Sequence, residues 1–172
     1  MCALQRGCEW KGTVNMIYND AALYNARLFD RAYRILNDKV QAGGKTKNEF
    51  DMALVVPTAV NCAFSCELFL KAMLPKGTKG HKLFYELFKK LDSDIAEVVQ
   101  DNVIRIMINK YNYKDYSKAD FDSDLIKHER TFEDWRYFHE GKEIGVNLEF
   151  MTTFQACLKA AADGTLEKQE RD

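Results

Sequence analysis

The chain has 172 residues, of which 25 are Lys or Arg and 26 are Asp or Glu, so its formal net charge is −1. This balance excludes a strongly basic nucleic-acid tail and an acidic disordered chain. Hydrophobic residues make up 47% and aromatic residues 12%, with only 9 Gly and 2 Pro, so a chain of this length can bury one sizeable core. We therefore expect one helical domain over residues 1–172, with its core at about 20–162 and peripheral segments at 1–19 and 164–172.

Scarce Pro and Gly and the three-four spacing of apolar residues predict an all-α fold, an up-and-down bundle of five to six helices. The first helix is expected at about 20–41, where Gly43-Gly44 would stop it. The second covers about 55–74, with Pro57 in its first turn and Pro75 after its end. The buried stripe of the first helix consists of Ala22, Ala26, Phe29, Tyr33, Leu36 and Val40.

The second half of the chain predicts four more helical segments. A short helix at about 81–91 follows a Lys/Gly loop, and Ser93 is expected to cap a helix that runs to about residue 110. The next helix would begin in the aspartate cluster Asp120, Asp122 and Asp124, where negative charge suits a helix N-terminus, and run to about residue 140. The last covers about 147–162, with Gly164 as its stop.

No membrane or secretory segment is predicted. The longest apolar run, Ala53 to Leu74, is interrupted by four polar side chains and is too polar for a span exposed to lipid. The first ten residues are polar where a secretory signal needs an unbroken apolar stretch. Five cysteines, an odd number in a chain of this size, favour reduced thiols, and we expect a cytoplasmic protein. The interrupting residues of the apolar run are Asn61, Ser65, Glu67 and Lys71.

Motifs for bound metals and nucleotide triphosphates are incomplete. Gly43 to Thr46 resembles the end of a phosphate-binding loop, but Lys39 stands where a glycine is needed. The aspartates from Asp120 onward alternate as in a calcium loop, but Leu125 and Thr131 replace the required Gly and Glu. Cys62 and Cys66 lie one helical turn apart and could face one ion, although the core-filler interpretation is favoured. No metal and no cofactor is predicted.

A lysine-rich segment with aromatic residues runs from Lys71 to Lys90. Its six lysines face one acid, Glu86, which gives a local formal excess of five charges. Lysines can neutralise phosphates while interleaved rings stack on bases, so the segment is a candidate nucleic-acid or nucleotide surface. Alternatively, Phe84 and Phe88 form a core stripe and the lysines cover it. The lysines are residues 71, 76, 79, 82, 89 and 90.

Glu67 stands among apolar residues, where a bare carboxylate costs several kcal/mol to bury. Lys71 follows four residues later, which is the favourable orientation for a helical ion pair. One interpretation is therefore a solvated or half-buried Glu67–Lys71 pair. The other is a polar position at a ligand cleft or a helix-helix interface.

The segment from His128 to Glu140 combines two histidines with two arginines. As a continuous helix it would place His128 and His139 beside the aromatic core, on one face with Phe121 and Leu125. Arg136 could be locked between neighbouring glutamates. Alternatively, an imidazole that moves a proton at the 2′-OH or leaving oxygen and a guanidinium that stabilises the phosphorane form a metal-free RNA cleavage site.

Two segments together resemble the HEPN superfamily of small prokaryotic helical domains. The first runs from Ala59 to Ala72, with a Glu67-x-x-x-Lys71-Ala72 pattern, and Gly80-His81-Lys82-Leu83 follows it. The second is Phe132-Glu133-Asp134-Trp135-Arg136-Tyr137-Phe138-His139-Glu140. The resemblance covers about residues 21–162.

The resemblance implies a bundle that often pairs as a symmetric homodimer, with a cleft at the subunit boundary. Many members are metal-independent ribonucleases of toxin-antitoxin, abortive-infection or antiviral systems, and others bind only nucleotides or partners, such as a nucleotidyltransferase-type antitoxin. Active members carry an arginine, four to six intervening residues and a histidine. Here Arg130 and His139 are separated by eight residues, and Arg136 and His139 by two.

The leading hypothesis is a HEPN-like domain that binds RNA or a nucleotide in prokaryotic stress or phage defence. In its enzymatic form His139 is the acid/base and Arg136 stabilises the phosphate. The rival is a non-catalytic dimerisation or partner-binding module, which the missing arginine-histidine spacing favours. The candidate binding residues are Glu67, Lys71, Lys79, His81 and Lys82.

Overall fold

A computed structural model describes residues 17–131 and 147–165, and every structural statement below concerns these two ranges. They contain helices and no strand, which confirms the all-α prediction. The predicted catalytic residues Arg136 and His139 lie outside the described residues. The elements are α1 (Asp20–Thr46), α2 (Glu49–Ala53), α3 (Val55–Ala72), η1 (Leu83–Leu87), η2 (Phe88–Lys90), α4 (Ser93–Tyr111), α5 (Lys118–Lys127) and α7 (Leu148–Ala162).

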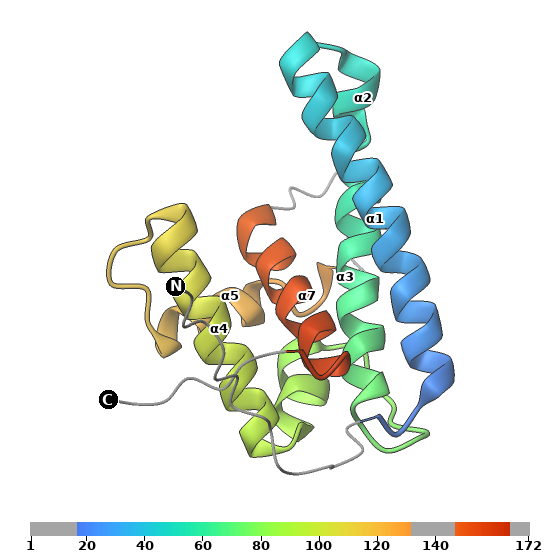
Figure 1. Cartoon of the computed structure of the whole chain (residues 1–172), viewed down its shortest axis with the longest axis vertical. Helices are drawn as coiled ribbons and strands as arrows, with labels where there is room; N and C mark the ends of the chain where they lie inside the picture. The colour runs from blue at the N-terminus through green and yellow to red at the C-terminus, as the bar shows by residue number, and fades with distance from the viewer. Residues whose placement is uncertain (1–16, 132–146, 166–172) are drawn as a thin grey trace, which may run out of the picture.

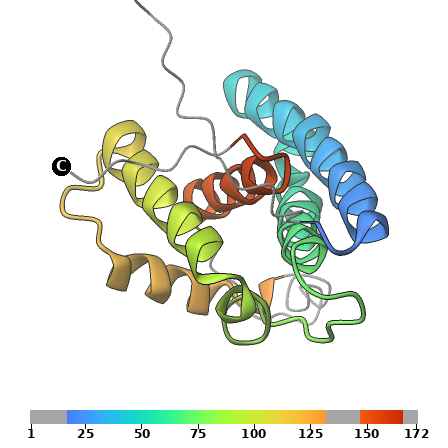
Figure 2. The ribbon, with the colours of Figure 1, turned by 60° about the horizontal axis from the view of Figure 1, so that its bottom comes forward.

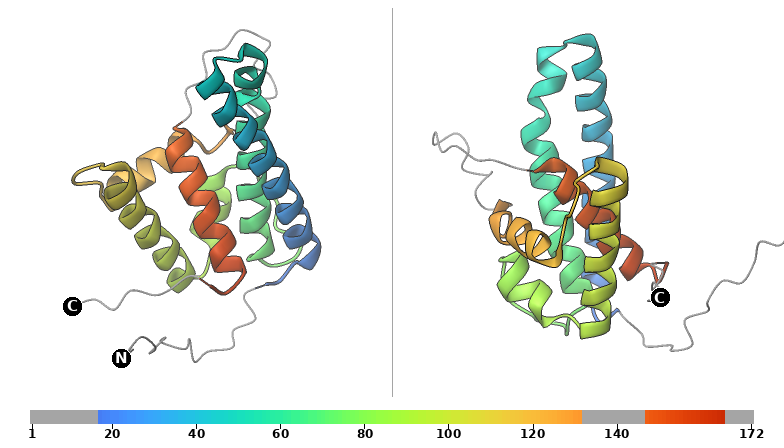
Figure 3. Two further views of the ribbon diagram at one scale, coloured as in Figure 1. Left: turned by 45° about the horizontal axis from the view of Figure 1, so that its top comes forward. Right: turned by 90° about the vertical axis from the view of Figure 1, so that its left-hand side faces the viewer.

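The four long helices form the predicted up-and-down bundle (Figure 1). Helix α3 packs against α1 and α7, and α7 packs against α4. Helices α1 and α4 run in one direction, whereas α3 and α7 run in the other. The η1 turn contacts both α3 and α5, which lie side by side with it in Figure 2. The end formed by α1, α2 and the start of α3 projects beyond the other helices (Figure 3).

Helix α1 continues through Gly43-Gly44 to Thr46, so the prediction that this glycine pair stops the helix is wrong. The helix ends at Lys47, which adopts the left-handed conformation with a φ of 56° and donates its N–H to the carbonyl of Gly43. Gly43 is buried, and a Cβ at this position would lie 2.5 Å from the Cβ of Asp51. Glycine is needed here because α2 packs closely against α1, not because the helix ends.

The remaining helix boundaries agree with the sequence in part. Pro57 lies in the first turn of α3, Pro75 follows its end, and Gly164 follows α7 with a φ of 67°, as predicted. Residues 83–90 form a π turn and a 3₁₀ turn instead of one regular short helix. Asp92 caps α4 in place of Ser93, because its side chain accepts a hydrogen bond from the N–H of Asp94 at 2.9 Å.

Helix α5 starts earlier and ends much earlier than predicted. Ser117 and Asp120 form a reciprocal capping box, so the helix begins at Lys118. The prediction of a continuous helix to residue 140 is wrong, because α5 ends at Lys127. The N–H of Glu129 bonds to the carbonyl of Ile126, three residues back, which tightens the last turn and breaks the helical ladder.

His128 belongs to the aromatic core, as the sequence predicts. Its Nδ1 lies 2.6 Å from the Asp124 carbonyl, and its Nε2 accepts the N–H of Asn147 at 2.8 Å. One ring nitrogen donates and the other accepts, which is the pattern of a neutral imidazole. Burial lowers the pKa of His128 below its ordinary value of 6.5. Neighbouring ring centroids lie 5.4 to 5.9 Å apart in a cluster of Phe88, Phe121, Phe150 and Phe154.

The two cysteines of α3 are part of the same core. Cys62 and Cys66 are both fully buried, as the core-filler interpretation predicts. Burial raises the pKa of the Cys66 thiol well above its ordinary value. In residues 17–131 and 147–165, no group of three or more His, Cys, Asp or Glu side chains is placed to hold a metal ion.

One described helical stretch, Glu49–Ala72, is long and apolar enough by composition to cross a membrane, with a mean hydropathy of 1.7 in its most apolar window. Half of that window is buried against the other helices. Length and composition are weak evidence of a span, because the core helix of a soluble protein passes the same test. The absence of a membrane segment stays a prediction.

Candidate functional site

Three of the five predicted binding residues meet at one buried carboxylate. Helix α3 places Glu67 in the interior, with only 2% of its surface exposed. Its Oε1 accepts a hydrogen bond from Lys71 Nζ at 2.7 Å and lies 3.0 Å from Nδ1 of His81. The predicted Glu67–Lys71 ion pair therefore forms, and His81 joins it from the following loop.

Hydrogen bonds to Glu86 fix the loop before η1 so that the side chain of His81 reaches Glu67. Glu86 Oε2 accepts the backbone N–H groups of His81 at 2.8 Å and Lys82 at 3.2 Å, and these bonds lower the pKa of Glu86. Gly80 has a φ of 121°, and a Cβ there would lie 2.5 Å from the same oxygen. Glycine is therefore favoured at this position, because it adopts a positive φ without strain and has no Cβ to clash with Glu86. The Gly-His-Lys-Leu motif is therefore explained by the turn that Glu86 holds.

His81 contacts a buried carboxylate through one ring nitrogen while more than half of its side chain is exposed. Its side chain is 56% exposed, and Nδ1 faces the carboxylate of Glu67. A carboxylate that accepts the Nδ1 proton fixes the tautomer and leaves the lone pair of the neutral ring on Nε2. Such an imidazole can accept a proton at Nε2, or donate a hydrogen bond from Nε2 once it is protonated.

Glu67 uses only half of its hydrogen-bonding capacity. Among the described residues, its Oε2 is buried without a hydrogen-bond partner, and the same holds for Oε2 of Glu129, which follows α5. A buried polar group without a partner costs about 1–3 kcal/mol of stability, and native proteins contain few of them. We call Glu67, Lys71 and His81 the Glu67 cluster. It stabilises the fold less than a carboxylate with hydrogen bonds at both oxygens would.

The lysines and aromatic residues around the cluster divide into two groups. Lys79 is exposed and has no hydrogen bond or ion pair within the described ranges, and Lys82 Nζ lies 4.0 Å from Glu129. Phe84 and Phe88 are buried in the core, so the core-stripe alternative holds for these two rings. The exposed ring of this segment is that of Tyr85. The segment therefore offers free positive charge and little aromatic surface.

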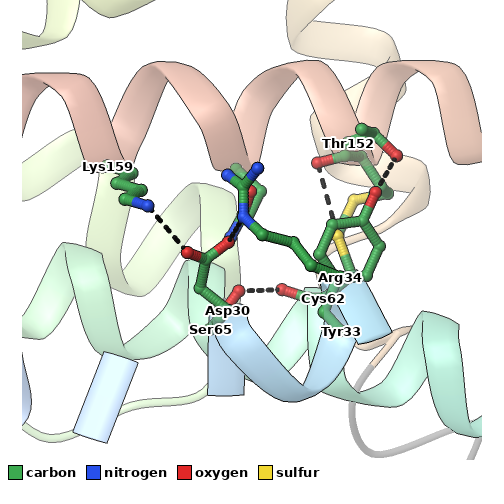
Figure 4. A network of polar contacts seen from close by, with 9 residues as sticks. Asp30, Tyr33, Arg34, Cys62, Ser65, Thr152 and Lys159 are labelled. Atoms are coloured by element: carbon green, nitrogen blue, oxygen red, sulfur yellow. Dashed lines mark hydrogen bonds and ion pairs between the residues drawn. The ribbon is translucent and has the colours of Figure 1, made fainter. Parts of the chain in front are cut away.

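A second buried carboxylate, which the sequence analysis missed, joins α1 to α7 (Figure 4). Asp30 accepts hydrogen bonds from Arg34 Nε at 2.8 Å, Gln155 Nε2 at 2.6 Å and Lys159 Nζ at 2.9 Å. Burial alone would raise the pKa of Asp30, but the bonds from Lys159, Gln155 and Arg34 outweigh it and hold this pKa below its ordinary value. The signal available in the sequence was a carboxylate four residues after Ala26, within the apolar stripe.

No family model, curated protein or solved structure matches this chain. The described residues form an all-α bundle in which a buried carboxylate contacts an exposed histidine. The resemblance to the HEPN superfamily stays a prediction from the sequence.

Proposed function

We propose that this chain is a HEPN-type helical domain that binds RNA or a nucleotide, in prokaryotic stress or phage defence, through a surface centred on His81. The observation that carries the proposal is the placement of this exposed imidazole, whose Nδ1 lies 3.0 Å from the buried carboxylate of Glu67. A half-satisfied carboxylate that positions a solvent-facing histidine is costly for the fold and useful for a site.

The neighbouring lysines suit a phosphate ligand. Lys79 and Lys82 flank His81 in the chain, and neither is held by a short ion pair among the described residues. Lys71 differs, because its ammonium group is already bonded to Glu67. We assign phosphate contact to Lys79, His81 and Lys82, and the positioning of His81 to Glu67 and Lys71. Tyr85, in the turn that follows, supplies an exposed ring for stacking on a base.

In the enzymatic form of this proposal, RNA is cleaved without a metal. A neutral imidazole takes the proton of the 2′-OH, the 2′-oxygen attacks phosphorus, and the 5′-oxygen leaves with a proton from an acid, which yields a 2′,3′-cyclic phosphate. His139 and Arg136 are the candidates from the sequence for proton transfer and charge stabilisation. Nε2 of His81 is a second candidate base, because Glu67 fixes its tautomer.

Binding of a fluorescent single-stranded RNA, followed by anisotropy at several salt concentrations, tests the binding function. We expect the double variant Lys79→Gln/Lys82→Gln to bind at least about tenfold more weakly. The slope of log K against log salt should fall by about 1.4, because each contact with a single strand contributes about 0.7. Lys114→Gln removes an exposed lysine on the α4–α5 connection and should bind like the wild type. Equal affinity of all three proteins would refute the assigned surface.

Incubation of an RNA pool with the protein in EDTA tests the enzymatic form. Cleavage that is lost in His139→Ala and Arg136→Ala would establish a metal-free ribonuclease. Loss of cleavage in His81→Ala at RNA concentrations that saturate this variant would assign a proton-transfer role to His81. Intact RNA at high protein concentration would leave a binding domain without this activity.

The second candidate function is a dimerisation module, and the solvent face of α1 favours it. Tyr24, Leu28 and Ile35 are exposed along one stripe of this helix. Antiparallel pairing of two copies about a two-fold axis between residues 29 and 30 would set each Tyr24 opposite Ile35 of the second copy. The same axis sets Asp20 opposite Lys39, an attractive charge pair. Sedimentation should then show a dimer that Ile35→Asp converts to a monomer, and a monomeric wild type would exclude this candidate.

A further inference from the structure

A groove lies between α1 and α7, and it shares no residue with the Glu67 cluster. It encloses about 590 Å³ and opens widely to solvent. Four cationic and two anionic side chains line it, so its formal charge is +2 (4 − 2). The charged lining residues are Arg27, Arg31, Arg34, Lys159, Asp30 and Asp163.

Asp30 holds two of the four cations in fixed positions. Arg34 binds its Oδ1 and Lys159 binds its Oδ2, so a single buried carboxylate sets the distance between a guanidinium and an ammonium group. Arg34 donates to Asp30 through Nε, and its two terminal nitrogens extend away from the carboxylate (Figure 4). The donors of this guanidinium that best fit a planar pair of oxygens therefore remain available.

The other two cations belong to the same face of α1. Arg27 pairs with Asp163 at 2.6 Å, across the mouth of the groove. Arg31, one turn further along, is exposed and has no hydrogen bond or ion pair within residues 17–131 and 147–165. Arg27 and Arg34 are each offset by an aspartate, so Arg31 is the arginine of this face whose charge has no anionic partner among the described residues.

We propose that this groove binds the dianion of a phosphate monoester. Two net positive charges match the charge of a phosphate monoester at neutral pH, and guanidinium groups present paired donors to its oxygens. Among the described residues that line the groove, Ala162 is the sole apolar one and none is aromatic, so this lining favours the phosphate over a base. The monoester is either the phosphate of a free nucleotide or the 5′-phosphate of an RNA end.

Calorimetric titration of the full chain tests this site and separates the two sources. The probes are AMP, adenosine, and a short single-stranded RNA with either a 5′-phosphate or a 5′-hydroxyl group. We expect binding that requires the phosphate, in AMP, in the phosphorylated RNA or in both, and none for adenosine. Phosphate-dependent binding of AMP alone identifies a nucleotide site, and binding of the phosphorylated RNA alone identifies an RNA end. Absence of any phosphate-dependent binding in the millimolar range would overturn the proposal.

A variant of Arg31 tests whether this groove, and not general positive charge, binds the phosphate. Arg31→Gln should weaken phosphate binding about tenfold or more and leave the melting temperature unchanged, because this side chain has no partner in the described fold. Lys114→Gln removes the same charge elsewhere and should bind normally. An equal loss in both variants would indicate diffuse charge attraction, and no loss in Arg31→Gln would also refute the site. The Lys79→Gln/Lys82→Gln protein should retain this binding, so the failure of either proposal is visible separately.

Discussion

Two buried carboxylates on adjacent helices, Asp30 and Glu67, differ in the hydrogen bonds that their oxygens accept. Asp30 on α1 accepts three hydrogen bonds, one from its own helix and two from α7, and both of its oxygens are used. Glu67 on α3 accepts two bonds at a single oxygen, and its second oxygen is buried with no partner in residues 17–131 and 147–165. Both residues are buried, with 3% of Asp30 and 2% of Glu67 exposed, so the difference lies in the partners and not in the depth.

The difference separates a carboxylate that joins two helices from one that positions an exposed histidine. The donors of Asp30 come from two regular helices, and the bonds join these helices across the bundle. One donor of Glu67 is Lys71 on its own helix and the other is His81, in a loop. The bonds to Asp30 use both carboxylate oxygens and connect α1 to α7. At Glu67 one oxygen has no hydrogen bond among the described residues, and the imidazole bonded to the other is more than half exposed.

The largest effect on stability is expected for Asp30→Asn. An amide leaves Lys159 and Arg34 without a counter-charge and turns an NH₂ group toward their donors, so the free energy of unfolding should fall by about 2–4 kcal/mol. Urea denaturation measures this change. Asp38→Asn, at an exposed position of the same helix, is the matched control and should change stability by less than about 0.5 kcal/mol. Equal losses in the two variants would contradict a structural role for Asp30.

A smaller loss is expected for Glu67→Gln, about 1–2 kcal/mol, because one carboxylate oxygen already lacks a partner and the amide keeps an acceptor for Lys71 or His81. The same urea measurement applies, with the exposed Glu49→Gln as control. The comparison of the two carboxylates fails if Glu67→Gln destabilises the protein more than Asp30→Asn does.

Buried His128 should contribute to the pH dependence of stability. The pKa of His128 is lowered in the folded state, so the unfolded chain binds the proton more readily as the pH falls below about 6.5. The contribution of His128 is therefore complete above pH 6.5 and decreases as the pH falls toward the lowered value. Asp124 and Lys127 are the charged groups that act on its pKa, with burial as the larger cause.

Urea midpoints between pH 8 and pH 5 measure this dependence. His128→Asn should flatten the acid limb of the curve. A curve that is equally steep in wild type and His128→Asn would show that another group causes the loss.

The smallest stability change is expected for His81→Ala, less than about 1 kcal/mol, because more than half of this side chain is exposed and water can replace its bond to Glu67. RNA affinity should fall in the same variant, so stability and binding separate at His81. A destabilisation comparable with that of Asp30→Asn would show that His81 holds the fold together.

Apolar spacing predicted the long helices but not their ends. Of the stripe predicted for α1, Ala22, Ala26 and Tyr33 are buried. Phe29, Leu36 and Val40 are only half-buried. The continuation of α1 through Gly43 was not predictable from the sequence, since this glycine makes room for Asp51 of a later helix and does not end its own. The end of α5 depends on His128, whose two ring nitrogens bond to backbone groups of separate segments. Single-helix spacing anticipated the Glu67–Lys71 pair. The connection from Asp30 to α7 joins residues 125 and 129 positions apart, which no local pattern reveals.

The nitrogen spectrum of the histidine rings tests the central claim, that Glu67 positions His81 for a ligand. In a long-range ¹H–¹⁵N experiment on the full chain, the signals of His81 and His128 are assigned with His81→Gln and His128→Asn. Addition of single-stranded RNA should shift the Nε2 signal of His81 and leave that of His128, both of whose nitrogens are bonded inside the fold, unchanged. An unshifted His81 signal at RNA concentrations that saturate binding would contradict the account.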